Sequence, residues 1–287
     1  MKIIKFQCKG LVSKKMSKKS AGFTLIELIM VIVILSIIAT VSVKFISHSA
    51  QGLVDTGERQ ALASSATIAV EKVLREVRRA LPNSVRAFDD GANKCLELVP
   101  ILYSSEYISV PTASAATSFQ SIQFVNAVGG ETGYVAVYPS GPESVYDANK
   151  AVSSITAVAS TVGAVGSADE NLQTIIFSGG ASYRFPTDSP KKRFYLVSQP
   201  ISFCDDASGR LWRYQNYGFH SDSSSSIPTT GSDRILIADS LQNLSFNYSP
   251  AQLQRNAVVR MSVTIVRPND ASESINVSQE VQLRNVP

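Results

Sequence analysis

The sequence has little that could carry out catalysis or hold a metal ion. It contains only two histidines, His48 and His220, and neither has another metal-ligating side chain at a useful spacing. It has no G-x-S-x-G, H-E-x-x-H or Walker-type glycine motif. Two aspartate pairs, Asp89–Asp90 and Asp205–Asp206, are expected to be turn residues rather than a calcium site. The sequence therefore predicts a protein that is not an enzyme and has neither a cofactor nor a metal site.

Charged residues are also scarce, at 17% of the 287 residues, while hydrophobic residues make up 44%. This balance excludes a disordered chain, and the presence of only one long apolar run excludes a polytopic membrane protein. The formal net charge of +4 originates at the amino terminus, because the first 22 residues contain seven lysines and no acidic residue. From Phe23 onward, 20 basic residues stand against 23 acidic ones, a balance of −3. We therefore expect no nucleic-acid binding by the rest of the chain.

The long hydrophobic run, residues 23–46, reads FTLIELIMVIVILSIIATVSVKFI. As a helix it would extend about 36 Å, which is enough to cross a bilayer. The lysines that precede it predict a cytoplasmic amino terminus, with the remaining chain on the other side of the membrane. The run is too long for the core of an ordinary signal peptide, and it lacks a small-x-small cleavage site at its far end.

One acidic residue, Glu27, interrupts this run. A carboxylate at the centre of a membrane helix costs roughly 2.5–3.5 kcal/mol on insertion scales. The side chain could reach the headgroups from near the end of the span, or it could pair with a positive partner. We favour pairing, because acidic residues within membrane helices usually have a function.

The segment Gly22-Phe23-Thr24-Leu25-Ile26-Glu27 follows a basic leader and opens an unbroken apolar stretch. It resembles the G-F-T-L-x-E signature of type IV prepilins and of type II secretion pseudopilins. The resemblance implies that a prepilin peptidase cleaves between Gly22 and Phe23, removes the leader 1–22 and methylates the new amino terminus at Phe23. It also implies that Glu27 pairs with the amino-terminal amine of a neighbouring subunit. A pair with the amine of its own Phe23, one helical turn away, is the local alternative.

Further segments resemble minor pilins of the mannose-sensitive haemagglutinin (MSHA) pilus, in particular those of the O type. They include residues 58–86 and CLELVPIL at 95–102, while the closing VQLRN at 281–285 is common among larger minor pilins and J-type pseudopilins. The resemblance implies a minor pilin in the tip or initiation complex of a type IV pilus, supporting pilus assembly and surface attachment. A J-type pseudopilin of a type II secretion system and a membrane-anchored adhesin remain alternatives.

The same resemblance implies where the protein is found and which partners it has. The partners would be the prepilin peptidase, the major pilin, other minor pilins and the inner-membrane assembly platform. Before assembly the subunit would cross the inner membrane once, with a periplasmic head, and afterwards it would belong to the pilus at the cell surface.

The sequence predicts an α+β fold, in which a long N-terminal helix packs on a large, mostly antiparallel β head. No proline occurs between Phe23 and Leu81. Apolar residues at a spacing of three and four continue the membrane helix, residues 23–46, into an amphipathic segment, residues 47–82, that ends at Pro82.

The head, residues 83–287, is expected to be rich in strands because apolar and polar residues alternate along it. Exposed loops are expected around 104–118, 140–170 and 221–232. The expected strands lie near 96–102, 121–128, 133–138, 172–177, 193–203, 211–219, 234–238, 243–248, 257–266 and 275–283.

Three cysteines occur in the chain. Cys8 lies in the leader, and it would be absent from a chain that starts at Met16 instead of Met1. Cys95 and Cys204 fall on the exported side of the membrane, in an oxidising compartment, and we predict a disulfide between them. Two free buried thiols are the alternative.

Overall fold

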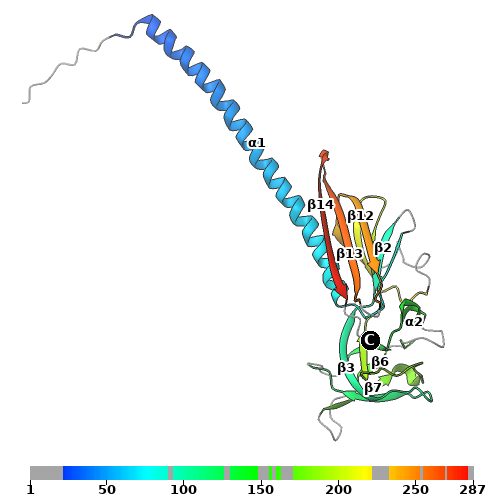
Figure 1. Ribbon diagram of the computed structural model, residues 1–287. Coiled ribbons are helices and arrows are strands. Elements are labelled where there is room, and N and C mark those ends of the chain that lie inside the picture. Colours follow the sequence, from blue (N-terminus) through cyan, green and yellow to red (C-terminus); the bar gives the residue numbers. More distant parts are fainter. Residues whose placement is uncertain are drawn as a thin grey trace, which may run out of the picture. The chain divides into compact units, whose positions relative to one another are not determined.

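The fold is described from a computed structural model (Figure 1). The residues described are 22–89, 93–125, 130–147, 155–156, 160–162, 171–221, 233–252, 255–268 and 270–283. Residues 1–21 of the expected leader, Asp90 and most of the expected loops 140–170 and 221–232 lie outside them. The chain divides into two units, Met1–Gly57 and Glu58–Pro287, which are described separately. We call the second unit the body.

Helix α1 (Leu25–Arg78) crosses the boundary between the two units. Within the body, its buried residues recur at helical spacing, so one face of the helix belongs to the hydrophobic core. They are Leu62, Ala66, Ala69, Val70, Val73, Leu74 and Val77.

Helix α1 ends at Arg78, earlier than the predicted end at Pro82. The N–H groups of Arg79 and Ala80 donate to carbonyls three residues back, at 3.0 and 3.1 Å, which tightens the last turn. The chain then pairs with an extended segment, because the Leu81 N–H donates to the Val99 carbonyl at 2.8 Å. The predicted end was four residues too late, because strand-like pairing begins at Leu81 and Pro82 has no N–H to donate to the Arg78 carbonyl.

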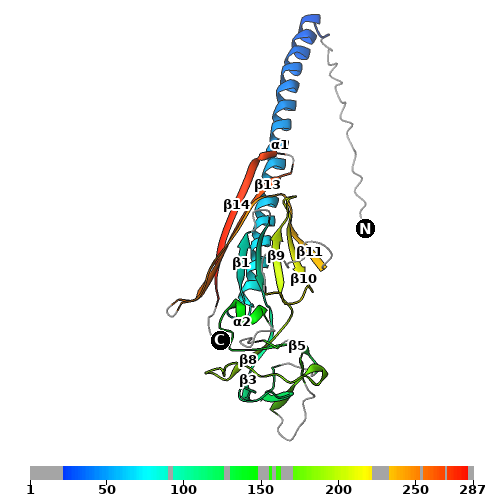
Figure 2. The same ribbon diagram turned by 90° about the vertical axis from the view of Figure 1, so that its right-hand side faces the viewer.

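Two antiparallel sheets share the core with α1. The first has the order β1-β2-β9-β10-β11 and the second the order β12-β13-β14 (Figures 1 and 2). The strands of the first are β1 (Arg86–Asp89), β2 (Lys94–Leu98), β9 (Ile201–Asp205), β10 (Leu211–Gln215) and β11 (Asp233–Ala238). Those of the second are β12 (Leu241–Ser249), β13 (Ala257–Arg267) and β14 (Asp270–Leu283). The predicted α+β arrangement is therefore confirmed.

The remaining strands close into a separate barrel, in the order β3-β4-β7-β6-β5-β8. They are β3 (Ile101–Ser109), β4 (Ser118–Ile122), β5 (Thr132–Val137), β6 (Ser160–Val162), β7 (Leu172–Phe177) and β8 (Arg193–Val197). Aromatic side chains fill the interior, including Tyr107, Phe119, Phe124, Phe177, Phe185 and Phe194. The barrel is inserted between β2 and β9, which are neighbours in the first sheet. It has its own core and therefore forms a second packing unit within the head.

A third apolar cluster joins the barrel to the segment that follows α1. It includes Leu81, Val99 and Val197, which are fully buried, together with Val145 and Tyr146 of the short helix α2 (Pro142–Tyr146). Buried apolar contacts therefore hold the barrel against the segment that follows α1. Farther along the chain, a 3₁₀ turn (Ser178–Gly180) follows β7.

The strand predictions were wrong at the points where the chain passes between sheet and barrel. The expected strand 96–102 is divided at Pro100 into β2 and β3, and the expected strand 193–203 is divided before Pro200 into β8 and β9. Proline has no N–H to continue a ladder, and each break lets the chain change sheets. The expected loop 104–118 is strand as far as Ser109, and the elements β1, β6 and α2 were not predicted.

Candidate functional site

The first candidate site is the start of α1, which follows Gly22 and Phe23 directly. Thr24 caps the helix: its hydroxyl oxygen accepts a hydrogen bond from the Glu27 N–H at 3.3 Å, and its carbonyl accepts one from the Leu28 N–H at 3.2 Å. Thr24 and Glu27 have the T-x-x-E spacing of a capping box. Our sequence reasoning overlooked Thr24, although this spacing was visible in the motif.

Glu27 lies in the first turn of α1 and is exposed. Within the described residues, no hydrogen bond or ion pair engages its carboxylate. The amino end of a helix carries a partial positive charge, which stabilises a carboxylate at this position. Glu27 is therefore held one turn from the Gly22–Phe23 bond, with its charged group free to meet a partner. Cleavage after Gly22, methylation of Phe23 and the ion pair of Glu27 stay predictions.

The helix beyond Glu27 exposes an apolar surface on all sides. The side chains from Leu25 to Ile46 are all exposed, and Phe23 itself is 76% exposed. Among the described helices, α1 alone is long and apolar enough to cross a membrane. An uncovered surface of this size would be unstable in water, so a bilayer or the helices of other subunits must cover it.

Two hydroxyl side chains within this apolar stretch are hydrogen-bonded inside the helix. The Ser36 hydroxyl donates to the Ile32 carbonyl at 2.6 Å, and the Thr40 hydroxyl donates to the Ile37 carbonyl at 2.9 Å. Because both hydroxyls are bonded, neither needs water or a partner when the segment is surrounded by hydrocarbon. Glu27 differs from these two residues in carrying a charge close to the start of the helix, while the other charged residue of the stretch, Lys44, lies near its far end.

A second polar cluster lies where α1 enters the body. Arg267 at the end of β13 forms ion pairs with Glu58 on α1 and, at 3.1 Å, with Glu273 on β14. Arg59 on α1 also pairs with Glu273. The four side chains connect the helix to the hairpin of β13 and β14.

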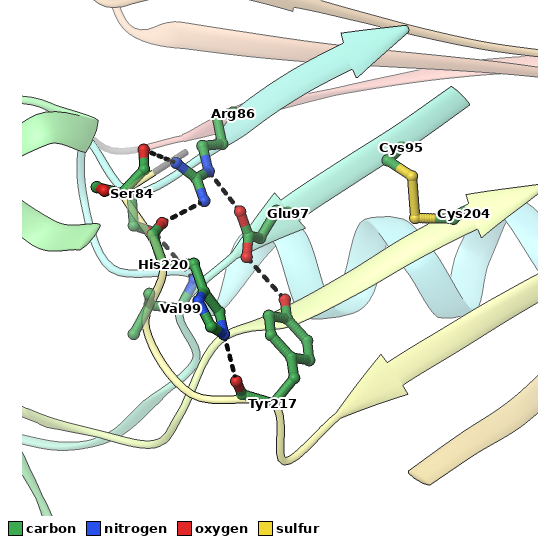
Figure 3. A network of polar contacts seen from close by, with 9 residues as sticks. Ser84, Arg86, Cys95, Glu97, Val99, Cys204, Tyr217 and His220 are labelled. Atoms are coloured by element: carbon green, nitrogen blue, oxygen red, sulfur yellow. Dashed lines mark hydrogen bonds and ion pairs between the residues drawn. A yellow bond between two sulfur atoms is a disulfide. The ribbon is translucent and has the colours of Figure 1, made fainter. Parts of the chain in front are cut away.

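A buried ion pair connects the first sheet to the loop after β10 (Figure 3). Glu97 on β2 is fully buried, and its carboxylate accepts hydrogen bonds from the Arg86 guanidinium and, at 2.8 Å, from the Tyr217 hydroxyl. The same guanidinium donates to the carbonyls of His220, at 2.8 Å, and Ser221, at 3.1 Å. Burial, and secondly the Glu97 charge, raise the pKa of Tyr217, which keeps its hydroxyl protonated as a donor.

The ring of Tyr146 on α2 completes this arrangement. The Arg86 guanidinium lies over it, 3.7 Å from the ring centroid. One arginine therefore contacts the sheet, the loop after β10 and the helix that follows β5. Because Glu97 is paired and hydrogen-bonded, we assign it a structural role rather than a catalytic one.

The structure contains the disulfide between Cys95 and Cys204 (Figure 3). The two residues are direct cross-strand partners on β2 and β9, and both are buried. Phe88, Trp212 and Tyr214 surround them. The bond closes a chain segment that contains the whole barrel.

The acidic pair Asp205–Asp206 is divided between two environments. Burial raises the pKa of Asp205, whose carboxylate accepts a hydrogen bond from the Lys94 N–H. Burial alone would also raise the pKa of Asp206, but hydrogen bonds from the Trp212 ring and from two backbone N–H groups outweigh it and lower the pKa. No group of three potential metal ligands occurs in the described parts of the chain.

Comparison with known proteins yields one match. The family described as the prokaryotic N-terminal methylation motif matches residues 17–43, which include Gly22, Phe23 and Glu27. No curated protein and no solved structure matches the chain. The match supports a type IV pilin-like or pseudopilin-like protein with an amino-terminal helix that can anchor it in a membrane.

Proposed function

We propose that the protein is a minor pilin of a type IV, MSHA-like pilus. The observation that supports this most strongly is the position of Glu27, which lies on the first turn of an exposed apolar helix that begins just after the Gly22–Phe23 bond. The methylation motif matches this same segment. Cleavage by a prepilin peptidase would place a new amine at Phe23, one helical turn from Glu27.

The proposed assembly step depends on that amine. An α-amine has a pKa of about 8, so it is mostly positive at neutral pH. Two apolar helices that slide along each other have no preferred register, and one ion pair between the Phe23 amine and the Glu27 carboxylate of a neighbour would supply it. The attraction is stronger than in water because hydrocarbon surrounds the pair.

The inserted barrel supports a place at the tip of the fibre. A body that contains two sheets and a six-stranded barrel would be difficult to repeat at every position along a fibre. We infer that the subunit starts assembly together with other minor pilins, and that its head acts by contact and not by catalysis.

Intact mass measurement tests the processing step. The full chain produced together with a prepilin peptidase should lose residues 1–22 and gain one methyl group at Phe23. Gly22→Val should block cleavage, because the branched side chain replaces the small residue at the cleaved bond. Ala21→Val, one position earlier, is the matched control and should be processed. An unprocessed and unmethylated wild-type protein would refute the proposal.

A second experiment tests the role of Glu27 after processing. Glu27→Gln should be cleaved normally but should co-purify with sheared pili at least tenfold less than wild type. Glu71→Gln removes a carboxylate from an exposed position farther along α1 and serves as the control. Equal incorporation of the Glu27 variant would contradict the ion pair.

Deletion of the gene separates the pilus from the secretion alternative. We expect fewer surface pili in the deletion strain and unchanged secretion of type II substrates. Normal pilus number with lost secretion would instead favour a J-type pseudopilin.

A further inference from the structure

A recess of about 540 Å³ opens where α1, the barrel and the second sheet meet. It is lined by residues from the end of α1 and the segment after it, from β3 and β8 of the barrel, and from the end of β14. They are Arg78, Ala80, Pro82, Ile101, Arg193, Tyr195, Gln282 and Leu283. The volume lies in the range that accommodates small-molecule ligands.

The described residues that line this recess carry charge of one sign. They include two arginines, Arg78 and Arg193, and no acidic residue. In the described part of the chain, neither arginine forms an ion pair, although six other arginines do. Glu106 is the Cα partner of Arg193 across the β3–β8 ladder, and even this carboxylate is not paired with it.

The polar groups that the structure describes at the end of α1 have partners other than the two arginines. The carbonyls at the end of α1 accept backbone hydrogen bonds, from Arg79 to Glu76, from Ala80 to Val77 and from Ile101 to Arg79. The Glu76 carboxylate is bound to Arg213 on β10. Two like charges that share a concave surface repel each other, so a bound anion would be stabilised by both.

The neutral residues of the recess specify the rest of the ligand. Tyr195, two residues along β8 from Arg193, also lines the recess and supplies a hydroxyl group beside the guanidinium. Ala80, Pro82 and Leu283 are buried apolar residues and provide a wall beside the charges. Arginine binds carboxylate, phosphate and sulfate groups through two parallel hydrogen bonds.

We propose that this recess binds an oxyanion that carries a short apolar substituent, with a carboxylate as the simplest case. The anion would lie between Arg78 and Arg193, and the apolar part would lie against Leu283 and its neighbours. The same chemistry could come from a free carboxylic acid or from the terminal carboxylate of a polypeptide. The inference does not depend on the proposed pilus function, and its failure would leave that function untouched.

Calorimetric titration of the full chain in detergent tests the site. The probes are acetate, hexanoate and inorganic phosphate, with chloride keeping the ionic strength constant. We expect saturable binding of hexanoate with a dissociation constant on the order of a millimolar. Hexanoate should bind at least tenfold more tightly than acetate, since each buried methylene can add about fourfold. Absence of saturable binding, or equal affinity for both acids, would overturn the proposal.

Three variants locate the binding. Arg78→Gln and Arg193→Gln should each weaken hexanoate binding about tenfold, the effect of one charge-assisted hydrogen bond. Arg79→Gln is the matched control: it removes the same charge from the adjacent position, whose side chain does not line the recess. Circular dichroism confirms that each variant is folded. An equal loss in all three variants would show a general charge effect and refute the site. Unchanged binding in Arg78→Gln and Arg193→Gln would also refute it.

A final comparison distinguishes the two sources of the carboxylate. A tripeptide that ends in leucine is titrated as the free acid and as the amide, alongside hexanoate. Binding of hexanoate and of the free acid, with no binding of the amide, supports a site open to polypeptide termini. Binding of hexanoate alone supports a site for small free acids. Binding of the amide as tightly as the acid would contradict recognition of an oxyanion.

Discussion

Reduction of the Cys95–Cys204 disulfide should destabilise the body strongly. The two cysteines are 109 residues apart in the sequence, and the segment between them contains the entire barrel. In the chain-entropy description, a cross-link over a loop of this length lowers the conformational entropy of the unfolded chain. This raises the free energy of the unfolded state by about 5 kcal/mol. We therefore expect the free energy of unfolding to fall by about 5 kcal/mol on reduction.

Trp212 provides the signal for this measurement. It is the single tryptophan of the chain, and it is the Cα partner of Cys204 in the β9–β10 pair. Guanidinium unfolding of the full chain in detergent, followed by tryptophan fluorescence, should show a lower midpoint with reducing agent than without it. The slope of the transition should rise as well, because a reduced unfolded chain exposes more surface.

A double variant, Cys95→Ala with Cys204→Ala, serves as the control. It should unfold at slightly lower denaturant than the reduced wild type, because it also loses the packing of two buried sulfur atoms. Reducing agent should not change its stability. If oxidised and reduced wild type differ by less than about 0.5 kcal/mol, the unfolded chain already keeps β2 and β9 together, and the loop-closure reasoning is refuted.

Three further predictions concern single residues. Glu97→Gln should lower the free energy of unfolding by about 3 kcal/mol, because it leaves the Arg86 guanidinium buried without a counter-charge; chemical denaturation measures this, and a loss below 1 kcal/mol would contradict the buried pair. Asp206→Asn should lower the melting temperature at pH 7 but not in strong acid. The folded-state pKa of Asp206 is lowered, so its contribution is present above the unfolded pKa and disappears as the pH falls through the folded value; a difference from wild type that does not depend on pH would refute this. Gly133→Ala should destabilise the barrel, because the added Cβ would lie 2.8 Å from the carbonyl oxygen of Val197 on the neighbouring strand; an unchanged melting temperature would show that β5 can shift.

The sequence was sufficient to predict the helix, the processing motif and the disulfide partners. These features have strong local signals: an unbroken apolar run, a G-F-T-L-x-E segment, and only two cysteines outside the leader. Strands of the two sheets that bury one face were also predictable. In β13, for example, Val259, Met261 and Val263 alternate with residues that are less buried.

The barrel was not predictable in the same way. The middle of β3, Ser104-Ser105-Glu106, resembles a loop because much of the strand lies on the exposed surface of the barrel. Closure depends on pairing between β3 and β8, which are separated by more than 80 residues, and no local pattern specifies it. The ion pair of Arg86 and Glu97 and the recess at the end of α1 likewise exist only after distant segments have come together.

The insertion of the barrel between β2 and β9 determines how the molecule bears tension. The barrel is attached to the first sheet at two adjacent strand ends, Leu98 and Ile201, and a force that draws these two ends apart would separate the strands one residue pair at a time. After the pairs Leu98–Ile201, Glu97–Ser202 and Leu96–Phe203, the next pair is Cys95–Cys204, which is covalent. Separation of β2 from β9 therefore stops after three pairs, and the disulfide and the backbone on its barrel side then carry the force.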